Sequence, residues 1–298
     1  MPQLYQEFVT EHQGSKWVEV LGARMHYVEV GDPDGEVILL GHGAPTNAFL
    51  WRNILLELAA PGRRVIAFDL IGFGRSDHPD LDYSFETHSA YMDGFIQELD
   101  LRDVHLVLHD ISGQAGFGYA AANPENVASL ASLEVLYRSF TGIDEMGPLI
   151  GPLFQQLQTP GVGEALMIDQ NLAVEGNLDL GTATDLDPAV KDTYAWFFTD
   201  PESRDVNLEF ALSTPIAGEP AAAAAFVDSY AAWLSTSDVP KLVFRPSDGL
   251  VPPGQVETAT EFNNVTVVDV PGSGHFGQED VPEVIAEQLN AFYETLGI

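Results

Sequence analysis

Cysteine is absent from this chain of 298 residues, and lysine occurs only three times. Without cysteine, neither a disulfide framework nor a thiolate nucleophile is available. Positive charge as a whole is scarce, because 12 Lys and Arg residues stand against 45 Asp and Glu residues and give a formal net charge of −33. We therefore expect neither nucleic acid nor an anionic membrane as a partner. The composition favours a halophilic or salt-adapted protein, although an organism with an acidic proteome would explain it as well.

Long apolar runs and targeting signals are also missing. No stretch approaches the roughly 18 apolar residues of a membrane span, and the first residues, MPQLYQEFVTEHQ, lack a basic region followed by an apolar core. We expect a cytoplasmic location. The glycine-rich stretch DLIGFGRSDHPD has neither a P-loop lysine nor a dinucleotide-binding pattern, so it is interpreted as structural. No cofactor and no metal site are expected.

Short apolar runs that alternate with helical patterns predict an α/β fold. Two alternating runs at the start are followed by almost continuously apolar ones, which is typical of strands covered on both faces of a sheet. The expected strands are 17–20, 25–30, 37–40, 64–68, the run from Val104, 131–136, 241–244 and 265–270. Helices are expected at 47–60 and 86–99 and after the run from Val104. Such an order predicts a mostly parallel, eight-stranded sheet whose site lies at the carboxyl ends of the strands.

The pattern changes between residues 138 and 238. Helical pieces broken by Gly and Pro, among them 187–198 and 219–234, occur there without an obvious buried strand. We interpret this segment as a helical cap inserted after the sixth strand. The core would then comprise residues 1–137 and 239–298, and aromatic residues of the cap imply an apolar substrate cavity between cap and sheet.

The stretch VHLVLHDISGQAGFG predicts a buried strand that turns abruptly into a helix. Such an elbow exposes the residue at its tip above the first amides of the helix. Asp110 lies at that tip, and the compact residues after it fit the elbow. Ser112 is a poorer nucleophile candidate, because it would place Asp110 and Gln114 at crowded positions. Asp110 is thus either an aspartate nucleophile or a simple helix cap.

Other candidate residues also follow strand ends. His275 lies among small residues after the last strand, where hydrolases with such an elbow place their histidine. Two carboxylates compete to orient it, since Glu134 follows the sixth strand and Asp248 the seventh. The HG-x-P loop after the third strand, which contains Ala44, would supply a backbone amide to an oxyanion.

Several of these stretches together resemble the haloalkane dehalogenase family of the α/β-hydrolase superfamily. The similar stretches are GARMHYVEVG, HGAPTNAFLWRNI, FDLIGFGRSDHPDLDY, LVLHD, DQNLAVEG, STPIAGEP and GHFGQED, and they span nearly the whole chain. The resemblance implies an α/β-hydrolase fold with a helical cap. It also implies that Asp110 is the nucleophile, that His275 activates water, and that Glu134 rather than Asp248 is the acid.

Two departures from the family pattern fall on the leaving-group site. The family has Trp directly after the nucleophile, and the subfamily has Asn in the oxyanion loop, whereas this chain has Ile111 and Ala44. Both backbone amides survive, but two side-chain donors for the halide are lost. We expect Trp196, Tyr194 and Trp233 to line the substrate pocket and to be candidates for replacing them.

The resemblance implies covalent hydrolysis, in which Asp110 forms an alkyl ester and water activated by His275 cleaves it. The expected partners are a small apolar halogenated substrate and water, with chloride or bromide as the leaving ion. One alternative is an epoxide hydrolase in which a tyrosine of the cap region, Tyr137, Tyr194 or Tyr230, protonates the leaving oxygen. A second alternative is a degenerate hydrolase or binding protein with little dehalogenase activity.

Overall fold

The computed structural model describes residues 1–298 and contains one sheet of eight strands. The strand order is β1-β2-β4-β3-β5-β6-β7-β8. β1 and β2 pair antiparallel, β2 is also antiparallel to β4, and the remaining pairs are parallel. The predicted mostly parallel, eight-stranded sheet is confirmed. Its strands are β1 Lys16–Val20, β2 Ala23–Gly31, β3 Glu36–Gly41, β4 Arg63–Phe68, β5 Val104–His109, β6 Val127–Leu133, β7 Lys241–Asp248 and β8 Val265–Gly274.

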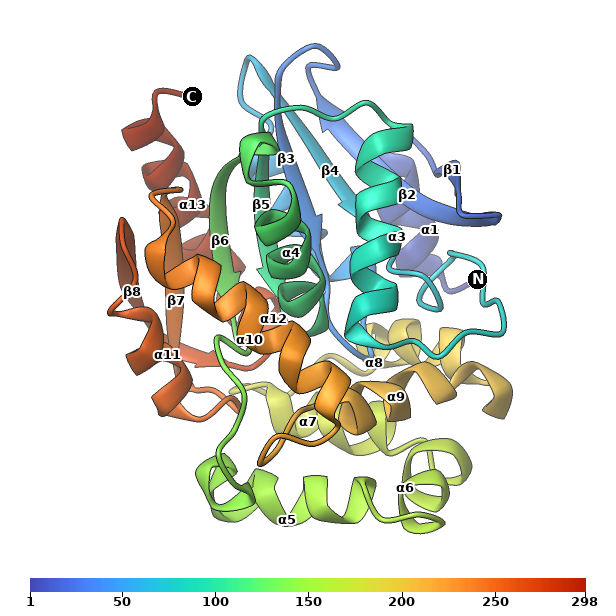
Figure 1. The fold of residues 1–298 in the computed structure, drawn as a ribbon. Helices are drawn as coiled ribbons and strands as arrows, with labels where there is room; N and C mark the ends of the chain where they lie inside the picture. The colour runs from blue at the N-terminus through green and yellow to red at the C-terminus, as the bar shows by residue number, and fades with distance from the viewer.

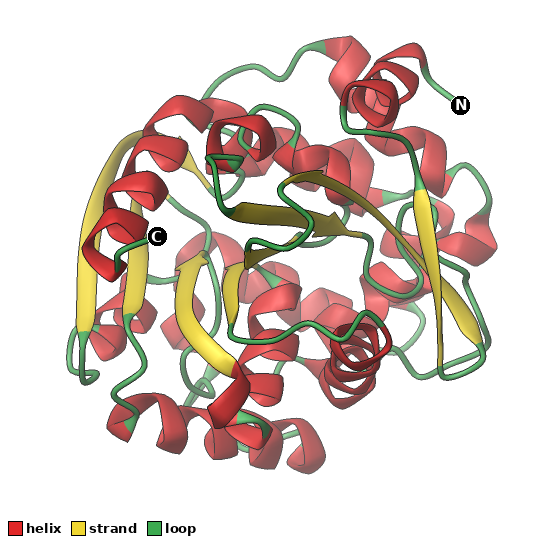
Figure 2. Cartoon of the chain, turned by 90° about the horizontal axis from the view of Figure 1, so that it is seen from above, coloured by secondary structure: helices red, strands yellow, loops and turns green.

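Helices cover both faces of the sheet, as the view from above shows (Figure 2). α3, α4 and α10 pack together on one face, in front of the sheet in Figure 1, while α2 and α13 pack on the other. The helices are α1 Gln3–Glu11, α2 Leu55–Leu58, α3 Phe85–Glu98, α4 Ile111–Ala122, α5 Gly147–Leu157, α6 Val162–Glu164, α7 Leu178–Gly181, α8 Pro188–Ala195, α9 Asp205–Ser213, α10 Ala221–Thr236, α11 Pro253–Ala259, α12 Gly277–Asp280 and α13 Pro282–Leu296. None of them is long and apolar enough to cross a membrane.

The core explains the continuous apolar runs. Every residue of β5 is buried, and so are five of the six residues of β3, because helices enclose these central strands on both sides. At the antiparallel edge, β1 alternates between more and less exposed residues, as a strand with one solvated face does. The sheet thereby holds the carboxyl ends of β3, β5, β6, β7 and β8 at one edge.

Some predicted elements differ from the structure. β7 and β8 each extend four residues beyond the expected ends at 244 and 270. The helix expected at 47–60 is instead a 3₁₀ turn, Ala48–Trp51, followed by the single turn of α2. All four residues of the 3₁₀ turn are buried, so the segment has no solvent face to sustain an amphipathic helix. Its backbone is fixed by tertiary contacts, because Ala48 N–H donates to Asp69 Oδ1 over 2.7 Å. The sixth strand, expected at 131–136, is shifted toward the N-terminus and ends at Leu133.

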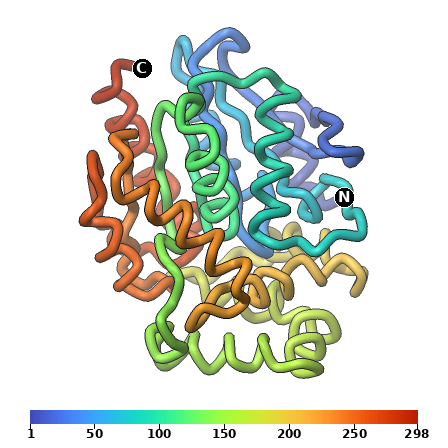
Figure 3. The backbone as a smooth tube through the Cα atoms, viewed as in Figure 1, coloured from blue at the N-terminus to red at the C-terminus, as the bar shows by residue number.

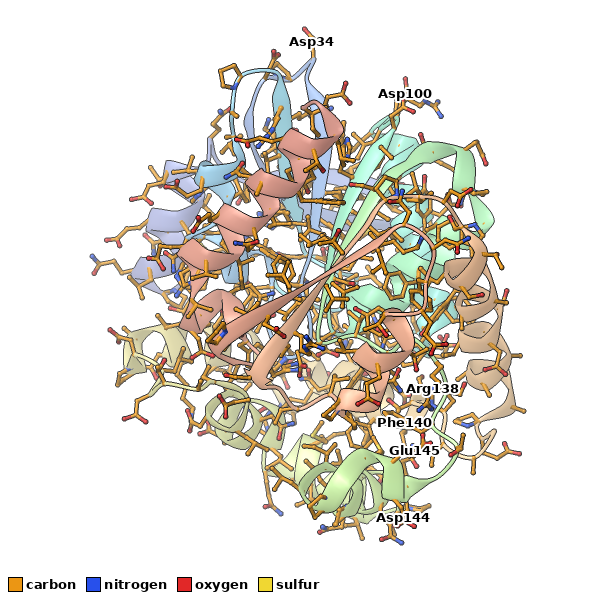
Figure 4. All side chains as sticks on the ribbon, turned by 90° about the vertical axis from the view of Figure 1, so that its left-hand side faces the viewer. Asp34, Asp100, Arg138, Phe140, Asp144 and Glu145 are labelled. Atoms are coloured by element: carbon orange, nitrogen blue, oxygen red, sulfur yellow. The ribbon has the colours of Figure 1, made fainter.

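The segment 138–238 contains α5 to α10 and no strand of the sheet. In the tube view its green to yellow part lies beyond the carboxyl ends of the central strands (Figure 3). Arg138, Phe140 and Glu145 lie together where the chain enters it, far from Asp34 and Asp100 at the opposite end of the molecule (Figure 4). α10 does not share this position, because it packs on α3 and α4 beside the sheet.

Candidate active site

Asp110 lies at a sharp turn between β5 and α4. Its backbone has φ 49° and ψ −126°, a left-handed φ that L-residues rarely adopt, and α4 begins at the next residue. A residue held in this way costs on the order of 1–3 kcal/mol and persists only where the surrounding structure enforces it. The side chain does not cap the helix by a hydrogen bond. The simple capping interpretation of Asp110 is therefore wrong, and its carboxylate is free for another role.

Ser112 holds the turn in shape. Its Oγ donates to the carbonyl of His109 over 2.7 Å and accepts from the N–H of the same residue over 2.9 Å. The loop after β3 then approaches closely, because a Cβ on Gly43 would lie only 2.4 Å from the Cβ of Asp110. This approach lets Ala44 N–H donate to Asp110 Oδ2 over 3.1 Å. Ser112 is thus a structural residue of the turn.

His275 bridges two carboxylates at this edge of the sheet. Its Nε2 lies 3.5 Å from Asp110 Oδ2, and its Nδ1–H donates to Glu134 Oε2 over 3.0 Å. The same Glu134 oxygen accepts the backbone N–H groups of Leu250 and Val251 over 2.6 and 2.8 Å. Glu134 also has a left-handed φ, 54°, directly after β6. Three strand ends therefore place the three side chains in one row, in which His275 is hydrogen-bonded to Glu134 and lies within ion-pair distance of Asp110.

Electrostatics favour the charged imidazole in this state. Burial lowers the pKa of His275, but hydrogen bonds and charge interactions with Asp110 and Glu134 outweigh it and raise the pKa to about 9. The neighbouring His109 behaves in the opposite way, because burial and the nearby His275 hold its pKa well below the usual value. Neutral His109 donates its Nε2–H to the carbonyl of His275 over 2.9 Å and supports the position of that residue.

Asp248, the competing carboxylate, is not part of this row. It is exposed at the end of β7, where its Oδ2 accepts a hydrogen bond from Ser247 Oγ over 2.6 Å. Geometry therefore brings Glu134, and not Asp248, to His275. Glu134 directly follows β6, whereas Asp248 is the last residue of β7 and lies four positions beyond Phe244, the residue that pairs with Leu133. The two carboxylates therefore differ in how far along neighbouring strands they lie.

A cavity of about 110 Å³ opens beside Asp110 and His275. Most of its wall is apolar and comes from both the sheet edge and the helical segment 138–238. The apolar lining includes Leu136, Phe140, Ile150, Leu153, Phe154 and Phe210. An engineered cavity of about 150 Å³ accommodates benzene in another protein, so this space suits a small organic molecule. The polar groups beside this cavity suit nucleophilic attack by the Asp110 carboxylate with His275 in reach.

The predicted aromatic pocket residues do not line this cavity. Trp196 is 44% exposed at the surface, and Trp233 packs half-buried against the core cluster. Tyr194 is fully buried and donates its hydroxyl hydrogen to Glu279 Oε1. This expectation is wrong because Trp196 lies at the surface while Tyr194 and Trp233 pack against the main core, and aromatic content alone does not reveal which way a helix is turned.

The hydroxyl groups of the three tyrosines considered as acids are all engaged in hydrogen bonds elsewhere. Tyr230 donates to the carbonyl of Leu136, and the hydroxyls of Tyr137 and Ser132 share a hydrogen bond of 2.8 Å. Burial raises the pKa of Tyr137, Tyr194 and Tyr230. No tyrosine lines the cavity, so none is available to protonate a leaving oxygen there.

Ala44 and Ile111, the two departures from the family pattern, differ in whether they line the cavity. Ala44 lines the cavity, whereas the side chain of Ile111 is fully buried and does not. Carboxamide side chains that the sequence reasoning missed are present instead: Gln114, Asn177 and Asn207 all line the cavity. Their only sequence signal is a polar residue within an apolar stretch, which is also found on solvated helix faces.

Comparison with known proteins shows the family to which the chain belongs. Residues 37–288 match the family model described as the alpha/beta hydrolase family, so the chain belongs to that class of enzymes. Haloalkane dehalogenases of Mesorhizobium japonicum and Agrobacterium fabrum are 36% and 34% identical to it, and the matches cover 91% and 92% of this chain and 88% and 90% of the relatives. The crystal structure of haloalkane dehalogenase DbeA from Bradyrhizobium elkani has 34% identity and a TM-score of 0.89, with coverage of 95% of this chain and 99% of that one. Within the α/β-hydrolases, the chain belongs to the haloalkane dehalogenase family.

Proposed function

We propose that the protein hydrolyses the carbon–halogen bond of small halogenated molecules, with Asp110 as nucleophile, His275 as base and Glu134 as the residue that orients His275. The observation that carries the proposal is the row of these three groups beside a cavity of about 110 Å³. Carboxylates are ionised near neutral pH, so Asp110 can attack carbon without prior deprotonation.

In the first step, Asp110 Oδ1 attacks the carbon that carries the halogen, and the halide leaves with the bonding electron pair. Oδ1 has no hydrogen-bond partner within the protein, whereas Oδ2 is held by Ala44 N–H. The ester therefore forms through Oδ1, and Oδ2 becomes its carbonyl oxygen, with a backbone donor already in place. Such preorganised donors stabilise the charge that develops on this oxygen when water attacks.

In the second step, His275 Nε2 takes a proton from water, and the resulting hydroxide attacks the carbonyl carbon of the ester. The alcohol leaves and the Asp110 carboxylate is restored. The net reaction converts the organic halide and water into an alcohol, a halide ion and a proton. Ester formation removes the negative charge of Asp110, which contributes to the raised pKa of His275. The pKa of His275 consequently falls in the intermediate, where a neutral base is needed.

Epoxide hydrolysis has less support. It requires an acid that protonates the leaving oxygen, and no tyrosine lines the cavity. We also propose that the charge of −33 reflects adaptation to salt, since it exceeds what the chain can neutralise internally.

The test of the proposed function separates the two steps. His275→Ala should release about one bromide per enzyme from 1-bromobutane and then stop, because the ester forms but is not hydrolysed. Mass spectrometry of the intact protein should show an added butyl group located at Asp110. Asp110→Asn is the matched control and should give neither burst nor adduct. Steady bromide release by His275→Ala at the wild-type rate would contradict the assigned roles.

A further inference from the structure

Two carboxamides in the cavity wall lack hydrogen-bond partners. Asn207, on α9, is 1% exposed, and neither its Nδ2 nor its Oδ1 has a partner. Gln114, on α4 one turn after Asp110, is also 1% exposed, and its Oε1 has no partner. Leaving such a group buried and unpaired costs about 1–3 kcal/mol. Groups of this kind in a ligand cavity are typical of a site that a bound molecule completes.

The remaining polar wall groups are already satisfied or differently placed. Thr214 lines the same cavity, but its hydroxyl donates to the carbonyl of Phe210 over 3.0 Å. Glu134 is occupied by His275 and by two backbone amides. Among the fully buried groups of the wall, the unmet hydrogen-bonding capacity is therefore concentrated in Gln114 and Asn207, which come from the core and from the helical segment respectively. Asn177, the third carboxamide of the wall, is only half-buried.

The chemistry of a carboxamide restricts what can satisfy these groups. A halide or an alkyl chain offers no hydrogen to donate, so it leaves both carboxamide oxygens unpaired. A hydroxyl group both donates and accepts, and it can pair with the oxygen of one carboxamide and the N–H of another. This conclusion holds for either orientation of the amide groups, because each carries one acceptor and one donor end.

We infer that Gln114 and Asn207 bind a hydroxyl group of the substrate, so that the preferred substrates are small halogenated alcohols rather than unsubstituted haloalkanes. The inference rests on the proposed function and specifies its substrate class. The reaction with such a substrate is the same displacement and ester hydrolysis, and it converts the halo-alcohol and water into a diol, a halide ion and a proton. The hydroxyl takes no part in the bonds that form or break.

The test compares 3-bromopropan-1-ol with 1-bromobutane, which have the same number of non-hydrogen atoms and differ in one hydroxyl. For the wild type, kcat/KM should be at least about tenfold higher for the alcohol, as expected for one or two good hydrogen bonds in a buried site. Asn207→Leu and Gln114→Met, which keep the side-chain size but remove the carboxamide, should each abolish most of this preference. Thr214→Val is the matched control from the same wall and should change both substrates to the same extent.

A second measurement keeps the inference independent of turnover. In the Asp110→Asn background, calorimetry should show tighter binding of 3-bromopropan-1-ol than of 1-bromobutane, and Asn207→Leu should remove the difference. If the wild type releases bromide from neither substrate, the proposed function is wrong. The binding comparison still tests the inference in that case. Equal binding of the two compounds, with no change in their ratio in a folded Asn207→Leu variant, would overturn it and leave water as the occupant of these carboxamides.

Discussion

The two walls of the cavity are built differently. On the sheet side, Asp110, Glu134 and His275 follow strand ends. Backbone amides hold both carboxylates, and His275 is hydrogen-bonded to Glu134. On the opposite side, the chain forms short helices and two π-helical turns, Ala165–Asp169 and Ala173–Asn177, and presents Asn207 without any partner. Reacting groups must be held within a fraction of an ångström, and rigid strand ends provide that accuracy. Substrate recognition is less demanding, because a bound ligand can supply the hydrogen bonds that this wall lacks.

The same contrast applies to strain. Asp110 and Glu134 both have left-handed φ values at the ends of adjacent parallel strands. The hydrogen bonds between strands and the helices packed on both faces enforce these conformations, so the stability of the core offsets the strain at the site. In the helical segment the free-energy cost is of another kind, because the buried carboxamide of Asn207 is unpaired. A bound ligand, rather than the fold, would remove this cost.

The largest expected effect distinguishes Glu134 from Asp248, the two carboxylates that were candidates for orienting His275. Glu134→Gln should lower kcat by on the order of 10²–10⁴, because the imidazole loses the partner that fixes its tautomer and stabilises its charge. Asp248→Asn, a change of the same kind on the next strand, should leave kcat within about twofold, since Asp248 faces solvent. Bromide release followed for both variants checks this. A greater loss of kcat in Asp248→Asn than in Glu134→Gln would contradict the assignment of Glu134 as the residue that orients His275.

The next effect concerns the pH dependence of stability. The pKa of His275 is raised to about 9 by Asp110 and Glu134, against about 6.5 in an unfolded chain. Its contribution to the free energy of unfolding is therefore fully present below pH 6.5 and is lost as the pH rises through 9, with a change on the order of 3 kcal/mol. Urea unfolding between pH 6 and 10 measures it. Asp110→Asn removes one of the two charges and should flatten the profile, and an unchanged profile would contradict the coupling.

The smallest effect concerns salt and the helical segment. Its only cations are Arg138, Lys191 and Arg204, and the first two already pair with Glu145 and Asp179. Raising KCl from about 0.1 M to about 1 M shortens the screening length from roughly 10 Å to 3 Å and weakens the remaining repulsion. We expect the unfolding temperature to rise by about 2–4 °C per kcal/mol gained. Hydrogen exchange should slow more in residues 138–238 than in the buried strands. A flat response would remove the salt-adaptation proposal.

Much of the fold could be predicted because its signals are local. Continuous apolar runs marked the central strands, and the abrupt strand-to-helix transition marked Asp110 at the tip of a turn. The helix at 47–60 was wrong because its residues are buried on all sides, and tertiary contacts such as that of Ala48 with Asp69 replaced helical periodicity. The aromatic pocket was wrong for a related reason, since the sequence does not reveal how a helix is rotated about its axis.

The sequence by itself determined that Asp110 and His275 follow strand ends, and the parallel order of the sheet then brings those positions to one edge. Asp110 and His275 were found in this way. Only the tertiary structure decided between Glu134 and Asp248, because both lie at that edge and the backbone amides of Leu250 and Val251 hold one carboxylate while the other points to solvent. It also decided that Gln114 and Asn207 face one cavity. Those two residues are 93 positions apart in the sequence, and no periodic pattern in the chain indicates that they line the same cavity.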